Sequence, residues 1–281
     1  MAGATPKISL LIPGRPLLSG EMLYGLNEWL IALIICTLFL CSIEIGFRLG
    51  RREKSKDNEL TKSQINMLQA ASLGLLALLL GFTFSMALAR FDTRKQLVLE
   101  EANAIGTTYL RAQLLPDPAR KEVSDLLRRY VDVRLEFYQS GINQRKLQRV
   151  NEETDKIHKA LWAYAIAAGG QDSRAIPTGL FIQTLNEVID LHAKRVTAME
   201  NHVPENIFLV LLIVAMLSLG LVGYGSGMAK NRNLLPTLIS IILIASVILL
   251  IMDLDRPRRG FIKVSQQSMS DLRENLKKTT P

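Results

Sequence analysis

Long apolar segments alternate along this chain with segments in which apolar residues recur at helical spacing between charges. Four segments carry no charge or a single one, and each approaches or exceeds the roughly 20 apolar residues needed to cross a hydrocarbon core about 30 Å thick. We therefore expect four transmembrane helices, at residues 29–47, 67–89, 207–224 and 234–252.

The second of these spans is predicted to continue beyond the membrane as one long helix. Residues 67–89 are 23 residues without a charge. No proline follows until Pro116, and Gly106 is the only glycine between, so nothing ends the helix at the membrane surface. At about 1.5 Å per residue, the stretch from Arg90 to Leu115 would extend ~39 Å into water.

The segment between the second and third spans also predicts helices, because apolar residues recur at helical spacing and no strand alternation occurs. Pro118 and Gly141 bound one predicted helix, and Gly169 ends the next. Another runs from Pro177 to just before Pro204. With the end of the second span, these helices would bury their apolar stripes in an extramembrane antiparallel helical bundle.

The predicted fold is thus an all-α membrane protein with one bundle. Its parts are an N-terminal tail (1–28), a first transmembrane hairpin (29–89), the bundle (90–204), a second transmembrane hairpin (205–252) and a C-terminal tail (253–281). The tail contains a short amphipathic helix, whose face from Phe261 to Leu272 could dock back on the bundle.

Small residues occupy every fourth position in the second span, and they form one ridge of the helix: Ala77, Gly81, Ser85 and Ala89. Such a ridge lets another helix approach closely. We expect helix packing there, either within one chain or between copies.

Charge predicts an orientation and excludes nucleic acid as a partner. Of the net charge of +8, the bundle segment contributes little, since residues 90–204 carry 17 Lys and Arg against 15 Asp and Glu. The loop between the first two spans has six Lys and Arg, and short basic loops usually face the cytoplasm. This favours an extracytoplasmic bundle, although Arg256, Arg258 and Arg259 after the fourth span oppose that orientation.

Two charged clusters follow the second and fourth spans, and parity places both at one membrane face. The predicted group is Arg90, Asp92, Arg94, Glu100, Glu101, Asn103, Arg111, Asp253, Asp255, Arg256, Arg258 and Arg259. In one interpretation, carboxylates and guanidinium groups pair and join the two helices. In the other, unpaired cations line a mouth that concentrates anions. The two interpretations are compatible, because some of these residues can pair while others stay unpaired.

No pattern in the chain indicates an enzyme, a cofactor or a metal site. Cys36 and Cys41 lie inside the first span, and no nucleophile stands beside a base. The three histidines are scattered, and Asp155 with His158 supplies only two potential ligands, so we expect a solvated helix face there.

Most of the chain from about Trp29 onward resembles the bestrophin-like domain family of mainly bacterial membrane proteins. The resemblance is carried by GLLALLLGFTFSMALARFDTRKQLVLEEANAIGTTYLRAQLLP (74–116), PTGLFIQTLNEVIDLHAKRV (177–196) and DLDRPRRGFIKVSQQSM (253–269). Recurrent family residues map onto a coupled structural or pore-mouth group: Arg90, Phe91, Arg94, Glu100, Glu101, Asn103, Tyr109, Arg111, Asp253, Asp255, Arg256, Pro257 and Gly260.

Because bestrophins are pentameric anion channels, the resemblance implies an oligomeric channel for small anions in the bacterial inner membrane, with the lipid bilayer and further copies of this chain as partners. The aromatic-rich neck of bestrophins has no counterpart in span 67–89, where only Phe82 and Phe84 occur. Bestrophins also place their helical domain in the cytoplasm, opposite to the charge-based expectation. The alternative function is a non-conducting scaffold or sensor whose helical domain binds a protein or an envelope component.

Overall fold

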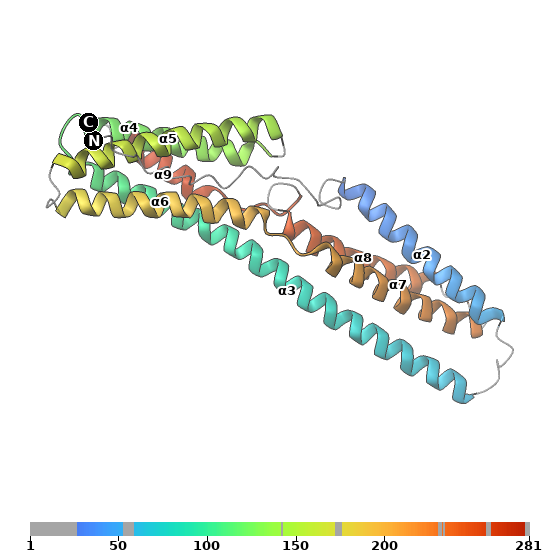
Figure 1. Ribbon diagram of the computed structural model, residues 1–281. Coiled ribbons are helices and arrows are strands. Elements are labelled where there is room, and N and C mark those ends of the chain that lie inside the picture. The colour runs from blue at the N-terminus through green and yellow to red at the C-terminus, as the bar shows by residue number, and fades with distance from the viewer. Residues whose placement is uncertain are drawn as a thin grey trace, which may run out of the picture. The chain divides into compact units, whose positions relative to one another are not determined.

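A computed structural model describes residues 27–52, 59–141, 143–171, 176–229, 232, 234–256 and 260–278. All regular secondary structure in these ranges is helical (Figure 1). The helices are α2 (Glu28–Arg52), α3 (Glu59–Ala112), α4 (Ala119–Gln139), α5 (Gln144–Gln171), α6 (Ile176–Glu200), α7 (Glu205–Met228), α8 (Leu234–Asp255) and α9 (Gln267–Lys278). The predicted all-α class is therefore confirmed, while most of the predicted N-terminal tail lies outside the described residues.

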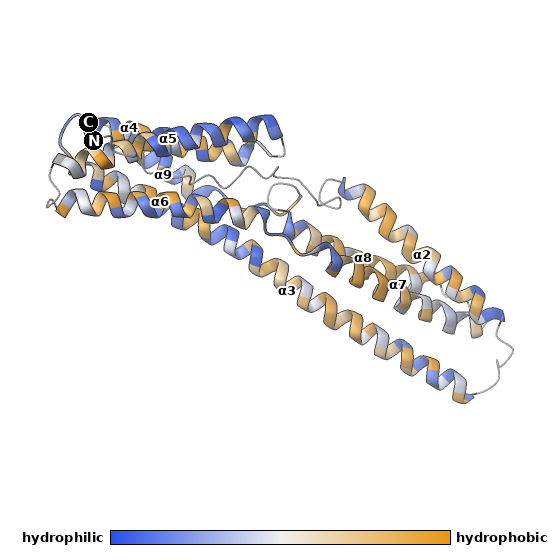
Figure 2. Cartoon of the chain, viewed as in Figure 1, coloured by the Kyte–Doolittle hydropathy of each residue, from blue (hydrophilic) through white to orange (hydrophobic). Residues whose placement is uncertain are grey.

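Four helices in the described part of the chain are long and apolar enough to cross a membrane: α2, α3, α7 and α8. Figure 2 shows apolar residues along α2, α7 and α8 and along the N-terminal half of α3. Each helix contains one of the four predicted spans, so the chain is a membrane protein. Each also extends beyond its predicted span by at least one residue.

Helix α3 runs without a break through 54 residues, which corresponds to a length of about 81 Å. It passes the point at Arg90 where the charges begin and ends shortly before Pro116. The apolar and charged halves of this segment are thus parts of one helix, because no proline interrupts its backbone hydrogen bonds.

The chain divides into two compact units. The first comprises Met1–Leu80 and Pro204–Leu249, and the second comprises Gly81–Val203 and Leu250–Pro281.

In the first unit, α2 and α7 pack closely through glycines. A Cβ atom placed on Gly46 would overlap the carbonyl oxygen of Gly220, and one on Gly223 would overlap that of Ile43. The side chain of Ser42 donates a hydrogen bond to the carbonyl of Met216, at 2.5 Å. Gly46 of α2 and Gly223 of α7 therefore allow close helix packing, as glycines do within membranes.

Replacing Gly223 with alanine is expected to destabilise the first unit by about 1–3 kcal/mol, because the added methyl group overlaps backbone atoms that cannot turn away. The control is Gly74→Ala in α3, where an added Cβ meets nothing within 4 Å. Apparent melting temperatures of the two variants in detergent would measure the difference. Equal melting temperatures would contradict the close packing of α2 and α7.

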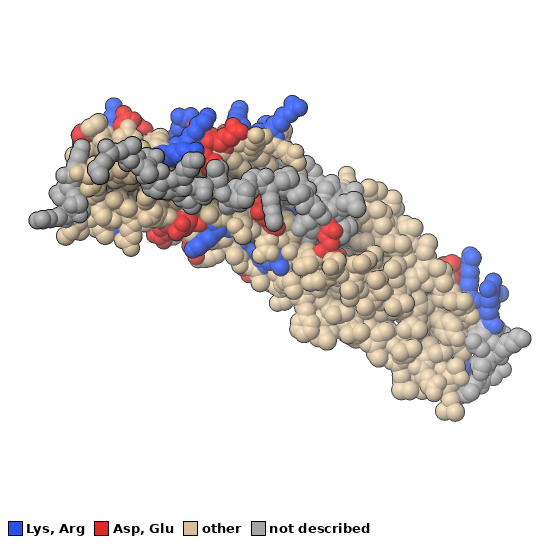
Figure 3. Space-filling view, viewed as in Figure 1, with Lys and Arg blue, Asp and Glu red and all other residues tan. Residues whose placement is uncertain are grey.

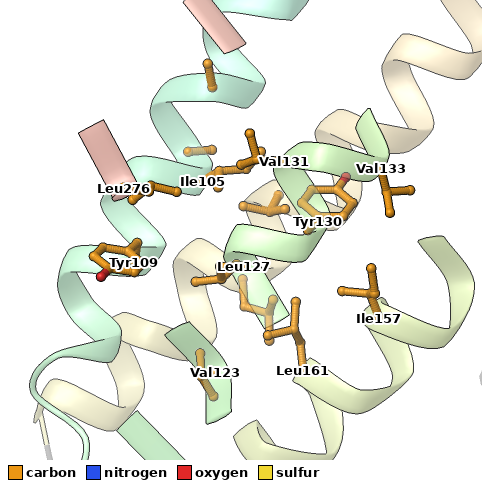
Figure 4. Packing of buried hydrophobic residues seen from close by; sticks show 14 of the residues in the cluster. Ile105, Tyr109, Val123, Leu127, Tyr130, Val131, Val133, Ile157, Leu161 and Leu276 are labelled. Carbon is orange, nitrogen blue, oxygen red and sulfur yellow. The ribbon is translucent and has the colours of Figure 1, made fainter. Parts of the chain in front are cut away.

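The core of the second unit consists of buried residues from the C-terminal half of α3 and from α4, α5, α6 and α9 (Figure 4). Tyr130 and Leu127 of α4 lie at its centre and are fully buried. Helix α9 contacts α4 and buries Met269, so the C-terminal helix does dock. It begins at Gln267 rather than near Phe261, whose side chain is exposed, because the preceding residues form a non-helical turn.

Candidate functional site

Arg94 of α3 is held in the second unit by hydrogen bonds to four backbone carbonyls, of which that of Leu254 is the longest at 3.4 Å, and by one ion pair. Its Nε donates to Ala198 at 3.0 Å, its Nη2 to Asn201 at 2.9 Å and its Nη1 to Asp255 at 3.1 Å. Nη2 also lies 3.4 Å from Oδ1 of Asp255. The Arg94 side chain is only 2% exposed, so it joins α3, the end of α6 and the end of α8 in a buried site.

Asp255 is the counterpart of Arg94 and is fully buried. Its Oδ2 accepts the backbone N–H of Val203 at 2.7 Å. The Nδ1 atom of His202 lies 2.9 Å from the Asp255 carbonyl oxygen. Carboxylate, guanidinium and backbone groups therefore satisfy one another, which is the condition for a buried ion pair to be tolerated.

Asp253 shapes the chain that follows α8. Its two carboxylate oxygens accept the backbone N–H groups of Phe261 and Ile262, each at 2.9 Å. Gly260, which directly precedes Phe261, has a φ of 101°, and a Cβ atom at Gly260 would overlap Oδ1 of Asp253. A residue with a side chain is disfavoured at this position for both reasons.

The other charged residues of the predicted group are dispersed. Arg90 is partly exposed and donates a hydrogen bond to the Asn201 side chain. Asp92 and Asn103 are exposed, and so is Glu100, which accepts a hydrogen bond from Gln96 at 3.2 Å.

Farther along α3, Arg111 donates to the carbonyl oxygen of Leu180 at 2.8 Å. Arg256 is buried, with 3% of its surface exposed. Arg258 and Arg259 lie outside the described residues. The predicted cluster therefore separates into a buried Arg94–Asp255 pair, an Asp253 turn, the buried side chains of Arg256 and Glu101, and scattered surface charges.

Glu101 belongs to a different buried cluster, two helical turns beyond Arg94. Its Oε1 accepts a hydrogen bond from the Tyr130 hydroxyl at 2.8 Å and lies 2.9 Å from Nε of Arg134. Its Oε2 pairs with Nη1 of Arg195. Burial disfavours the ionised carboxyl, but the charges of Arg134 and Arg195 outweigh burial and lower the pKa of Glu101 to about 2.

Two histidines that appeared scattered in the sequence meet beside this cluster. The ring of His158 on α5 lies 5.0 Å from that of Tyr130 and 5.2 Å from that of His192 on α6. Burial, followed by the charge of Arg134, lowers the pKa of His158 to about 4 and that of His192 well below its usual value. Both imidazoles are therefore neutral near pH 7. Asp155 is exposed as expected, but His158 is only partly exposed and its ring packs against Tyr130 and His192.

The sequence contained one signal for this cluster, which is arginine at positions of a buried stripe. Arg134 follows Tyr130 and Val131 on α4, and Arg195 follows Val188 and Leu191 on α6. Charged residues at such positions are rarely fully buried without a partner. Nothing in the sequence indicated which carboxylate would pair with them.

The second unit is expected to lose stability as the pH falls from about 6.5 to 4. Because the pKa of His158 is lower in the folded chain, the unfolded chain binds its proton first, and acid favours unfolding by up to roughly 3 kcal/mol. Melting temperatures of His158→Gln measured across this range should depend less on pH than those of the wild type. The exposed neighbouring variant Lys159→Gln should keep the full dependence, and equal slopes would contradict the assignment.

The ridge of small residues on α3 is exposed in the part of the chain that the structure describes. Ala77, Gly81, Ser85 and Ala89 are all exposed. A Cβ atom added at Gly81 would meet nothing within 4 Å. Of the two expected kinds of packing, the one within a single chain is absent from the described residues, and packing between copies stays a prediction.

Among the described residues, no three His, Cys, Asp or Glu side chains are grouped so that they could hold a metal ion. The buried charged residues brought together are arginines and carboxylates, and guanidinium groups are suited to ion pairing and to contact with anions.

A family model described as the Bestrophin-like domain matches residues 33–269 of this chain. The chain belongs to the Bestrophin-like domain family. Curated protein sequences give no match to this Bestrophin-like protein.

Solved structures of a bacterial bestrophin homologue from Klebsiella pneumoniae resemble the fold. One single-residue variant has a TM-score of 0.60 and 18% sequence identity, and the alignment covers 88% of this chain and 99% of that one. A structure phased with zinc has a TM-score of 0.59 and 18% identity, and the alignment covers 89% of this chain and 97% of that one. A second variant has a TM-score of 0.61 and 17% identity, and the alignment covers 89% of this chain and 97% of that one. At these identities the likeness establishes a shared fold.

Proposed function

We propose that this Bestrophin-like protein is a subunit of an oligomeric channel that passes small anions across a bacterial inner membrane. The support is membership of the family, together with fold similarity to a bestrophin homologue. Bestrophins conduct anions, and members of such families are typically channels rather than enzymes.

The observation that carries the proposal is the exposed face of α3. Beyond the ridge of small residues, exposed positions continue at helical spacing along the same side of the helix, and most of them are small or polar: Ser85, Ala89, Thr93, Gln96, Glu100, Asn103 and Thr107. Leu78 and Phe82 precede them and are exposed as well. A face of this composition suits the wall of a water-filled path between copies of the chain, because it offers small or polar surface to hydrated ions.

Cations at the two edges of this face, about 100° around the helix from its nearest members, would favour anions. Arg90 is partly exposed and Lys95 is exposed, whereas Arg94 and Arg256 are buried. We therefore assign attraction of anions to the first pair and a structural role to the second. In this proposal α3 to α6 form the antiparallel bundle outside the membrane.

Conduction is tested with purified protein in planar bilayers. The expected result is current whose reversal potential in a chloride gradient follows the anion, from a particle whose mass shows several copies. Ala89→Phe should strongly reduce the current, because the ring would obstruct the exposed face. Leu88→Phe is the control, since Leu88 lies about 100° around α3 from Ala89.

Absence of current from a verified oligomer would overturn the channel proposal. It would favour the alternative of a non-conducting scaffold whose helical unit binds a protein or an envelope component.

We also propose that the basic end of α2 faces the cytoplasm and the helical bundle the other side. Arg51 and Arg52 end this helix, and cations gather there in Figure 3, whereas α4 and α5 carry both signs of charge. In a variant lacking Cys36 and Cys41, a membrane-impermeant thiol reagent applied to intact cells should label Gln139→Cys and not Ser63→Cys. The reverse labelling would overturn this orientation.

A further inference from the structure

The cluster around Glu101 contains more positive than negative charge. Among the described residues Glu101 is the one carboxylate that pairs there, and it pairs with both Arg134 and Arg195, whose side chains are 0% and 1% exposed. The groups that face it from the neighbouring helices are the neutral imidazoles of His158 and His192 and the hydroxyl of Tyr130. One positive charge therefore remains uncompensated in a site removed from water, where an unpaired charge is costly.

The excess charge can be located on Arg134. Its Nη1 and Nη2 atoms are buried, and no described residue accepts a hydrogen bond from either. The guanidinium carbon of Arg134 lies 4.8 Å from the ring centre of Phe137. The ring covers one face of the guanidinium group, and an aromatic ring offers no acceptor to the N–H groups at its edge. A buried donor without an acceptor costs about 1–3 kcal/mol, and more when it is charged.

Two further nitrogen atoms near Arg134 are in the same condition. Nε2 of His158 and Nδ1 of His192 are buried, and no described residue forms a hydrogen bond with them. The His158 ring lies 5.0 Å from that of Tyr130, whose hydroxyl binds Glu101, and 5.2 Å from that of His192, so both imidazoles lie beside the cluster. A neutral imidazole carries one N–H, so each ring can donate one hydrogen bond.

We propose that this cluster holds one small monovalent anion of the halide class, bound by Nη1 and Nη2 of Arg134 and by an imidazole N–H of His158 or His192. A water molecule could accept the same hydrogen bonds but would leave the charge uncompensated. A single negative charge balances the cluster, and complete burial of Arg134 favours a compact ion. The bound anion stabilises the second unit, and this inference is independent of whether the protein conducts.

The test is a halide titration of the purified full-length protein in detergent at pH 7.5. Chloride or bromide replaces isethionate at constant ionic strength, and the melting temperature is recorded. The wild type should show a saturable rise with halide, because a ligand that binds only the folded state stabilises it. Arg134→Met should abolish the rise, since Glu101 and Arg195 then balance each other. Arg129→Gln, which alters an exposed arginine of the same helix, should retain it.

Because Arg134→Met removes a buried charge and can fail to fold, crystals of the wild type grown in bromide supply a second measurement. Anomalous scattering should place a bromide ion in contact with Arg134. Water in place of bromide at that position would overturn the proposal. So would a wild-type melting temperature that does not change with halide concentration, or a folded Arg134→Met variant whose melting temperature still rises with halide.

Discussion

Replacing Glu101 with glutamine is expected to destabilise the second unit by about 3–5 kcal/mol, the cost of breaking a buried ion pair from one side. The carboxylate lies between Arg134 and Arg195, and all three side chains are buried. An amide would remove the negative charge that pairs with both guanidinium groups, and its NH2 group would add a donor where acceptors are needed. The apparent melting temperature in detergent and the yield of monodisperse protein measure the effect.

The matched control is Glu100→Gln. Glu100 precedes Glu101 on α3, is exposed and accepts a hydrogen bond from Gln96. Its replacement should change stability by less than about 0.5 kcal/mol, as is usual for surface positions. Similar losses in both variants would show that Glu101 does not hold the second unit together.

Asp255→Ala is expected to have an effect of the same size, for a different reason. The Asp255 carboxylate accepts a hydrogen bond from the backbone N–H of Val203 at 2.7 Å and neutralises the charge of Arg94. Removing it leaves the Arg94 charge buried and the Val203 N–H without its acceptor, which together should cost about 3–5 kcal/mol. Because these contacts join the end of α8 to the segment before α7, limited proteolysis of the variant should cut near residues 201–204.

Asp92→Ala serves as the comparison for Asp255→Ala, since Asp92 is an exposed aspartate of α3, two residues before Arg94. Asp92→Ala should have the melting temperature of the wild type and resist the protease equally well. If Asp255→Ala behaves like Asp92→Ala, the buried pair does not hold these segments together.

Much of the fold was predictable because its determinants are local. The length of the apolar segments specified four spans, and the absence of proline between residues 67 and 115 specified that α3 continues as one helix. Helical periodicity indicated α4, α5 and α6, with their ends near glycine and proline. The predicted start of the last helix was wrong, because Asp253 binds the N–H groups of Phe261 and Ile262 in a turn.

The candidate site was less predictable, because charges are paired by three-dimensional proximity. Arg94 and Glu101 are seven residues apart and lie on one side of α3, so the sequence grouped them together. They are separated by about 10 Å along the helix axis and meet different partners. Arg94 pairs with Asp255, and Glu101 pairs with Arg134 and Arg195.

The sequence alone determined that this is an all-helical membrane protein with one helix longer than a membrane is thick, since helix formation and lipid solubility depend on composition over short stretches. Only the tertiary structure decided that His158 and His192 lie together, that Arg134 is buried with unmet donors, and that the small residues of α3 are exposed. Those features depend on which helix faces which, and packing between residues distant in sequence decides that.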